Sequence, residues 1–262
     1  DRGTLTLANG RARHGAIAFT GVNGVIRNLE GDGRMTLDAA ARGPLAEMLR
    51  IVATSPVNDW IGKALATSTG SGNADLKLNL DLPLMHLDTS TAKGSVVLAG
   101  NDIRIAPDSP LLAGAKGRVE FTHKGFAISG ASARVYGGDL TFDGGLQPDG
   151  TLRFNGQGTA TADGLRRATE LGQVARVATA LAGRTSYRAS LGFVRGEAEV
   201  NVTSNLVGLA LNLPAPLAKA AETPLALRYQ TTVEPLVAGQ PARDTLRFEL
   251  GGIVQAQYLR EL

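Results

Sequence analysis

The side chains best suited to metal binding or proton transfer are few in this sequence and lie far apart. The three histidines, His14, His86 and His123, show no metal-ligand spacing between any two of them. Neither an HExxH helix motif nor a GxSxG nucleophile motif occurs. The absence of cysteine excludes a disulfide framework, a thiolate metal site and a thiol nucleophile. We therefore expect ordinary surface or strand positions for the histidines, no cofactor, and no enzymatic activity.

Two further features resemble known sites but have simpler explanations. The Gly-Gln-Gly tripeptide at 156–158 follows a predicted strand and precedes a predicted helix, as in a dinucleotide-binding loop. That loop also needs a small residue where Thr161 stands, and a parallel βαβ unit, whereas the surrounding turns predict antiparallel strands. Glu197 and Glu199 share one strand face and resemble a catalytic carboxylate pair. A solvent-exposed strand face accounts for both.

The composition is that of a folded protein with many short strands. Hydrophobic residues make up 43% of the 262 residues, which excludes a disordered chain, and 33 glycines and 11 prolines are spread along it. The net charge is +3, and no Lys/Arg run is interleaved with aromatics, so nucleic-acid binding is not expected. No stretch reaches the ~20 apolar residues of a membrane span. Because the sequence opens at Asp1 without a Met or signal peptide, we expect a fragment of a longer protein.

The clearest pattern is strict alternation between residues 74 and 84. Every even position from Leu76 to Leu84 is leucine, and the odd positions from 75 to 81 are Asp, Lys, Asn and Asp. Since successive side chains of a strand point to opposite faces, this segment predicts a strand with one leucine face and one polar face.

Shorter alternating pairs recur along most of the chain. They are Val96 and Leu98, Ile103 and Ile105, Val119 and Phe121, Phe126 and Ile128, Leu140 and Phe142, Leu152 and Phe154, Leu191 and Phe193, Val200 and Val202, and the trio Leu246, Phe248 and Leu250. Glycine-bearing turns separate them about every ten residues, which predicts an antiparallel sheet.

Helical patterns interrupt the strands and suggest a division of the chain. We expect β strands over 1–43, a helical insertion over 44–66 (helices at 44–53 and 56–65), and an antiparallel meander over 73–160. An amphipathic helix is predicted over 163–183, ending at Gly183. Residues 184–262 are predicted to be strands, with a Pro-rich short helical segment near 214–221.

The repeated apolar face has to be covered, because burying one leucine contributes roughly 1.5–3 kcal/mol. A second sheet, the helices, a protein partner or lipid acyl chains could cover it. Alternation alone does not choose among them, and an ordinary sandwich core fits the pattern as well.

Three segments resemble one protein family. Residues 204–219 read SNLVGLALNLPAPLAK, which resembles the SxLxGLxxxLPxPLxK segment of the YhdP family of AsmA-like bacterial envelope proteins. Residues 131–143 (ASARVYGGDLTFD) are similar to a strand pair with a GG turn in AsmA-like proteins, and residues 45–63 to the family's helical insertion ahead of a Leu-rich strand. The resemblance covers most of the chain and is most specific at 204–219.

The resemblance implies a fold and a function. It implies a long, twisted antiparallel sheet forming an open, apolar-lined β-groove that helices cap or cover. Such relatives are anchored in the inner membrane, extend through the periplasm and move phospholipid between the inner and outer membranes of Gram-negative bacteria. The chain would then bind phospholipid acyl chains and reach the membranes through regions outside this fragment. The residues expected to line the groove are Leu76, Leu78, Leu80, Leu82, Val119, Phe121, Phe126, Ile128, Leu140, Phe142, Leu152 and Phe154.

A second hypothesis gives the chain no lipid to carry. Exposed strand edges are templates for pairing with another chain. The chain would then be a non-catalytic structural or assembly module of the outer membrane that works with an envelope protein partner.

Overall fold

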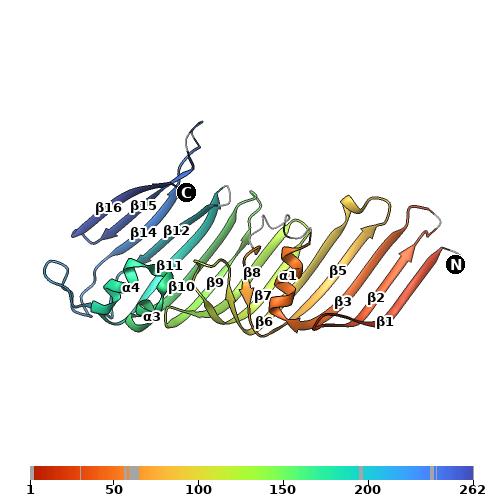
Figure 1. Cartoon of the computed structure of the whole chain (residues 1–262), viewed down its shortest axis with the longest axis horizontal. Helices are drawn as coiled ribbons and strands as arrows, with labels where there is room; N and C mark the ends of the chain where they lie inside the picture. Colours follow the sequence, from red (N-terminus) through yellow and green to blue (C-terminus); the bar gives the residue numbers. More distant parts are fainter. Residues whose placement is uncertain are drawn as a thin grey trace. The chain divides into compact units, whose positions relative to one another are not determined.

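The computed structural model describes residues 3–29, 31–55, 58, 65–194, 197–236, 239 and 241–261 (Figure 1). Over these residues it is a mainly β protein with a few short helices, as predicted. Its 16-stranded open antiparallel sheet has the hydrogen-bonded order β1-β2-β3-β5-β6-β7-β8-β9-β10-β11-β12-β14-β15-β16. The short strands β4 and β13 pair with β6 and β11. Almost every strand is thus bonded to its neighbours in sequence, as expected of a meander.

The chain divides into two compact units, Asp1–Ala131 and Ser132–Leu262, and the division falls within β8. The first unit holds β1 (Thr4–His14), β2 (Ile17–Arg27), β3 (Arg34–Pro44), α1 (Leu45–Ala53), β4 (Thr69–Gly70), β5 (Asn73–Pro83), the 3-10 turn η1 (Leu87–Thr89), β6 (Thr91–Arg104), β7 (Leu112–Thr122) and most of β8 (Gly125–Val135). The second holds β9 (Gly138–Leu146), β10 (Leu152–Thr161), α3 (Ala162–Arg167), η2 (Thr169–Leu171), α4 (Gln173–Val177), η3 (Ala178–Ala180), β11 (Leu181–Val194), β12 (Glu197–Ser204), β13 (Leu209–Leu211), β14 (Leu227–Val233), β15 (Arg243–Leu250) and β16 (Val254–Glu261).

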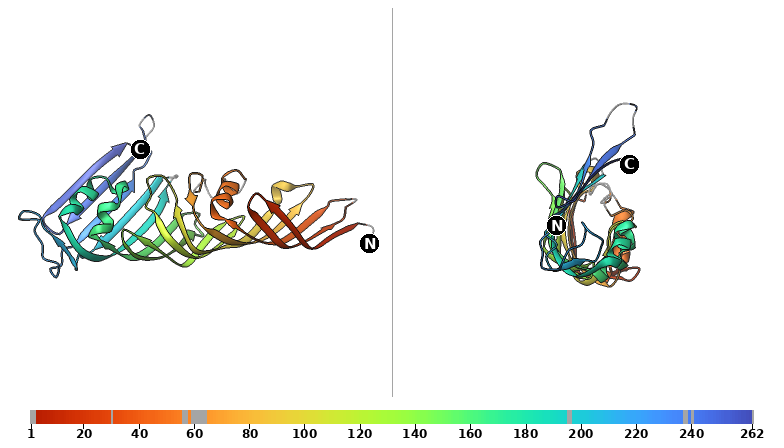
Figure 2. Two further views of the ribbon diagram at one scale, coloured as in Figure 1. Left: turned by 60° about the horizontal axis from the view of Figure 1, so that its bottom comes forward. Right: turned by 90° about the vertical axis from the view of Figure 1, so that its left-hand side faces the viewer.

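Helix α1 confirms the predicted helix at 44–53 and packs on the sheet of the first unit (Figure 2). Leu45 and Met48 are buried against Ile17, Ala41 and Ala74, which lie at one end of β2, β3 and β5. The second predicted helix, at 56–65, lies mostly outside the described residues. No helix in the described part of the chain is long and apolar enough to cross a membrane.

The continuous helix predicted over 163–183 is wrong. The segment contains two short α-helices, α3 and α4, and two 3-10 turns, and the chain reverses at Gly172, where φ is 54°. The predicted apolar stripe, which included Val174 and Ala178, does not form one buried face, because Ala178 is buried whereas Val174 is about half exposed. The helical region ends before Leu181, where pairing with β13 begins. Gly183 therefore lies inside β11 and does not cap a helix.

The short helix predicted near 214–221 is also wrong. Residues in this range form turns, and the chain folds back so that Lys219 pairs with Leu211. The Leu211 N–H donates to the Lys219 carbonyl at 2.9 Å, and the Lys219 N–H donates to the Leu211 carbonyl at 3.0 Å. These bonds use backbone groups that a helix would have paired locally.

Bulges interrupt the long strands at positions that the sequence pattern does not reveal. The register of β1 with β2 and of β2 with β3 shifts next to Asn9 and Gly21, whose φ angles are 51° and 58°. A bulge inserts one residue, so the side chains beyond it change faces relative to simple alternation. For this reason the apolar face of β1 and β2 does not follow simple alternation in the sequence.

Gly208 is a position where the backbone requires glycine. Its φ is 90°, and a Cβ there would overlap the carbonyl oxygen of Arg184. The two residues are also hydrogen-bonded, because the Arg184 N–H donates to the Gly208 carbonyl at 2.9 Å. Gly150 has a similar φ of 81°, but nothing lies near its Cβ position.

We expect Gly208→Ala to destabilise the fold more than Gly150→Ala. Both substitutions force a side chain into left-handed backbone, at about 1–2 kcal/mol. Only Gly208→Ala adds a steric overlap, at about 1–3 kcal/mol more. Thermal unfolding of the two variants measures the difference. Equal melting temperatures would contradict the close approach of residues 184 and 208.

Candidate functional site

The leucine face predicted for β5 extends across the neighbouring strands of the first unit. Strand pairing places Leu76 beside Ala41 of β3 and Val96 of β6, and Val96 beside Val119 of β7. Side chains of directly paired residues lie on the same side of an antiparallel sheet. Parallel rows run Leu5–Ile26–Met35–Leu82, Leu7–Gly24–Leu37–Leu80–Ala92 and Ala39–Leu78–Gly94–Phe121. These rows form one apolar face, which we call the first apolar face.

The opposite face of the same strands is polar. Arg34 donates to the Asp81 carboxylate through Nε at 2.7 Å and through Nη2 at 2.5 Å. Nη1 of Arg42 lies 3.3 Å from Oδ1 of Asp75. Hydrogen bonding to Arg34 lowers the pKa of Asp81 below its usual value. The side chains of Arg34, Arg42 and Asp75 are more than half exposed, and 28% of the Asp81 side chain is exposed, so this face is in contact with water. The ion pairs therefore lie on one face of these strands and the apolar rows on the other.

The first apolar face is only partly covered. Helix α1 reaches Leu76, Val96 and Leu98, but Leu78, Leu80 and Leu82 lie beyond its hydrophobic cluster and remain half-buried. The fully buried positions are mostly small, as at Ala39 and Ala92. The larger side chains beyond the α1 cluster, as at Leu78 and Leu80, therefore remain partly exposed to solvent.

Aromatic rings lie over glycines on this face. A Cβ on Gly94 would lie 2.6 Å from the Cζ atom of Phe121, so the Phe121 ring occupies the space above Gly94. Glycine at this position lets the ring lie close to the sheet.

The second unit repeats the arrangement on what we call the second apolar face. Pairing of β9, β10 and β11 gives the rows Leu146–Leu152–Phe193, Gly144–Phe154–Leu191, Phe142–Gly156–Ala189 and Leu140–Gly158–Tyr187. The rows continue through β12, β14, β15 and β16, as in Ala189–Val202–Tyr229–Phe248–Ala256. Phe154 lies over Gly144 as Phe121 lies over Gly94. Burial raises the pKa of the Tyr187 hydroxyl on this face.

One end of the second apolar face is closed by the segment that carries the family-like motif. Its residues Leu206, Leu209 and Leu211 are buried together with Ala162 of α3 and Leu250 of β15. Leu213 and Leu217 pack against the same cluster. The leucines of the motif therefore form a hydrophobic seal at this end of the strands.

Lys219 is the only cation of the motif, and the structure assigns it to folding. Its side chain is buried, and Nζ donates to the carbonyls of Leu209 at 2.7 Å, Ala220 at 2.8 Å and Ala221 at 3.4 Å. Desolvation lowers the pKa of Lys219, and the charge of Glu222 opposes that shift. Lys219 therefore ties the returning chain to β13 and has no free donor for a ligand.

The groups considered for catalysis do not assemble. His14 and His86 are exposed and His123 is half-buried, and no group of three potential metal ligands occurs in the part of the chain that the structure describes. Glu199 is half-buried, and its Oε1 accepts from the Val233 N–H at 2.9 Å, so it joins β12 to β14. The interpretation of this residue as merely solvent-exposed was wrong.

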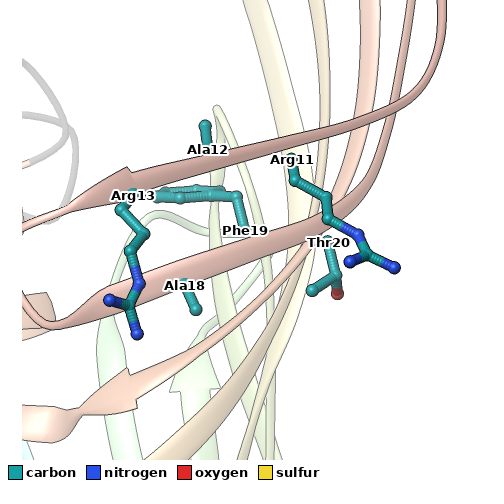
Figure 3. A pocket seen from close by; sticks show the side chains of 6 residues that line it. All are labelled: Arg11, Ala12, Arg13, Ala18, Phe19 and Thr20. Carbon is teal, nitrogen blue, oxygen red and sulfur yellow. The ribbon is translucent and has the colours of Figure 1, made fainter.

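A shallow hollow on the β1–β2 hairpin contains Arg11, Arg13 and Phe19 (Figure 3). The two arginines are exposed, and Ala12 points to the opposite side of β1 (Figure 3). Ala12 pairs with Phe19, which belongs to the first apolar face. The hollow lies within one hairpin and assembles no set of groups for chemistry.

Comparison with known proteins agrees with this arrangement. The model of the family described as "YhdP protein" matches residues 4–262. The chain belongs to the YhdP family. It is also 26% identical over 203 residues to the intermembrane phospholipid transporter YhdP of Escherichia coli (strain K12), a match that covers 75% of this chain and 16% of that protein. That relative is a transporter, and this chain spans about a sixth of its length. No solved structure matches the chain.

All twelve residues predicted to line the groove are half-buried, and none is fully buried. Strand pairing puts the four leucines of β5 with Val119 and Phe121 on the first apolar face, and the four residues of β9 and β10 on the second. Phe126 and Ile128 lie on β8 before Gly130, whose φ is 58°. The less exposed side chains of β8 lie at even positions before Gly130 and at odd positions after it. This change of phase indicates a bulge, which keeps both side chains on the face of Ala131.

Sequence reasoning missed part of each face. It did not include the first three strands, which contribute Leu5, Leu7, Phe19, Ile26, Met35 and Leu37. The signal was present in β3, where the odd positions from Met35 to Ala41 are all apolar. It also used residues 204–219 only as a mark of the family and did not foresee their role as a seal.

We expect Lys219→Met to lower the free energy of unfolding by about 2–3 kcal/mol. The substitution keeps the apolar stem but removes the donor that satisfies carbonyl groups in a buried setting. Lys116→Met, at an exposed position of β7, is the matched control and should change stability by less than about 0.5 kcal/mol. Chemical denaturation measures both. Equal effects would show that Lys219 does not tie this segment together.

Proposed function

We propose that the two apolar faces bind the acyl chains of phospholipids that the protein carries between membranes. The observation that carries the proposal is the uncovered apolar surface. On each face, rows of Leu, Val, Phe and Tyr side chains cross several strands and remain half-buried.

The energetic argument favours an apolar ligand over water. Each Å² of apolar surface removed from water contributes roughly 25 cal/mol, so covering the exposed parts of these leucines and phenylalanines favours binding of an apolar ligand. Acyl chains are flexible, uncharged and need no hydrogen-bonding partner. The faces suit them because their large side chains offer apolar contact, and in the first unit the ion pairs lie on the opposite side of the sheet.

The family gives the proposal its biological setting. The E. coli relative is an intermembrane phospholipid transporter. In this proposal the chain is one segment of an inner-membrane-anchored protein in the periplasm, and its strands form part of an apolar-lined groove. Phospholipid would pass along that groove between the inner and outer membranes, with the head groups in water. No bond is made or broken, so no catalytic residue is required.

The test replaces two central leucines of the first apolar face. We expect the amount of phospholipid that co-purifies with the double variant Leu78→Asp, Leu80→Asp to be at least tenfold lower than with the unmodified chain. Each carboxylate placed against hydrocarbon costs about 2.5–3.5 kcal/mol. Lipid extracted from the purified proteins is quantified by mass spectrometry, and circular dichroism checks that the sheet is intact.

The control changes the neighbouring residues on the polar face of the same strand. Lys77→Asp with Asn79→Asp makes β5 more negative by three charges, against two in the leucine variant, without touching the apolar rows, and its lipid content should equal that of the unmodified chain. A folded Leu78/Leu80 variant with unchanged lipid would contradict the proposal. Absence of lipid from every variant, together with crosslinking to an envelope protein, would favour the assembly module instead.

A further inference from the structure

One ion pair lies on the second apolar face. Pairing of β14, β15 and β16 aligns Val233, Asp244 and Arg260, and the rows next to them are Leu246–Tyr258 and Phe248–Ala256. By the same pairing, no other charged side chain lies on this face of the described strands β9–β12 and β14–β16. A charge on a surface that is otherwise free of charge requires a specific reason.

The pair is built asymmetrically. Only 4% of the Asp244 side chain is exposed, whereas 41% of the Arg260 side chain is exposed. Arg260 donates to the Asp244 carboxylate through Nε at 2.8 Å and through Nη2. Among the described residues, no partner is found for Nη1. Asp244 thus fixes the guanidinium plane and leaves one nitrogen with two N–H groups for a ligand.

The surroundings complete a site for an anion. Hydrogen bonding to Asp244 raises the pKa of Arg260, and the nearby Tyr229 adds to that shift, so the cation persists at any physiological pH. Tyr258, next to Arg260 on the same face, is 66% exposed. A guanidinium with free N–H donors beside exposed aromatic surface is typical of phosphate recognition.

We propose that Arg260, oriented by Asp244, binds the phosphate of a phospholipid whose acyl chains lie on the second apolar face. The inference rests on the proposed function and adds to it a fixed position for the head group. The ligand is a phosphodiester, and free phosphate shares its anionic oxygens, so the experiment has to separate these two sources.

The length of the strand fits such a ligand. From Arg260 to Val254 the strand rises about 20 Å. Val254 pairs with Leu250, which belongs to the hydrophobic seal. One leaflet of a bilayer has a hydrocarbon thickness of about 15 Å. A phospholipid anchored at Arg260 can therefore extend its chains along Tyr258, Ala256 and Val254 and end at the seal.

The experiment compares two lipids with identical acyl chains, phosphatidylglycerol and diacylglycerol. The diacylglycerol lacks the phosphate. We expect the purified chain to take up phosphatidylglycerol from vesicles with at least tenfold preference over diacylglycerol, measured by native mass spectrometry. Arg260→Gln should remove that preference and leave uptake of diacylglycerol unchanged. Arg247→Gln, on the opposite face of β15, is the matched control and should keep it.

A second variant protects the test against misfolding. Arg260→Gln alone leaves the buried Asp244 carboxylate without its partner, which destabilises folds strongly. The double variant Arg260→Gln, Asp244→Asn replaces the ion pair with neutral groups and should show the same loss of preference.

The outcomes separate the two proposals. If neither lipid binds to the unmodified chain, the proposed function fails. If both lipids bind equally to it, or the double variant keeps the preference, the head-group site fails while the acyl-chain proposal stands. If millimolar inorganic phosphate binds at Arg260 while the unmodified chain shows no preference for phosphatidylglycerol over diacylglycerol, the site belongs to free phosphate and the lipid assignment is overturned.

Discussion

The alternation of strand side chains is the constraint on which the rest of this structure depends. Each strand has to direct every second residue to the same side, so a row of leucines along β5 forces its neighbours to present apolar or small groups beside them. The strands of both units satisfy this requirement. The charged pairs of the first unit fall on the other side, whereas the second apolar face contains one ion pair, Asp244–Arg260. A soluble sheet normally hides such a surface under a second sheet. Here the described residues cover only part of it.

In each unit the covering segments lie at one end of the apolar face. In the first unit α1 packs against one end of the apolar face. In the second unit, residues around Leu206 to Leu217 and α3 seal one end. The buried ammonium of Lys219 and the close approach at Gly208 hold that seal in place. The sealed ends remove apolar surface from water where strands terminate, and the middle of each face remains for a ligand.

The sequence allowed the β class, the antiparallel order and the polarity of the faces to be predicted, because period-two alternation is a local property. Leu76 to Leu82 illustrate this, since their face could be read without tertiary information. The apolar faces of β1 and β2 could not be predicted, although the strands were, because bulges at Asn9 and Gly21 change the phase of the alternation. The helix over 163–183 was mispredicted because its apolar periodicity is weaker than the pairing of Leu181 with Leu211. Whether the faces are covered could not be predicted, because coverage depends on contacts between distant segments.

The most direct test of the central claim asks which face of β5 touches lipid. A photo-crosslinking amino acid is placed at Leu80 in one variant and at the adjacent Asn79 in another, in cells whose phospholipids are isotope-labelled. The two side chains lie on opposite faces of one strand. The account predicts phospholipid adducts from position 80 and none from position 79. Adducts of equal yield from both positions, or protein adducts alone from position 80, would contradict it.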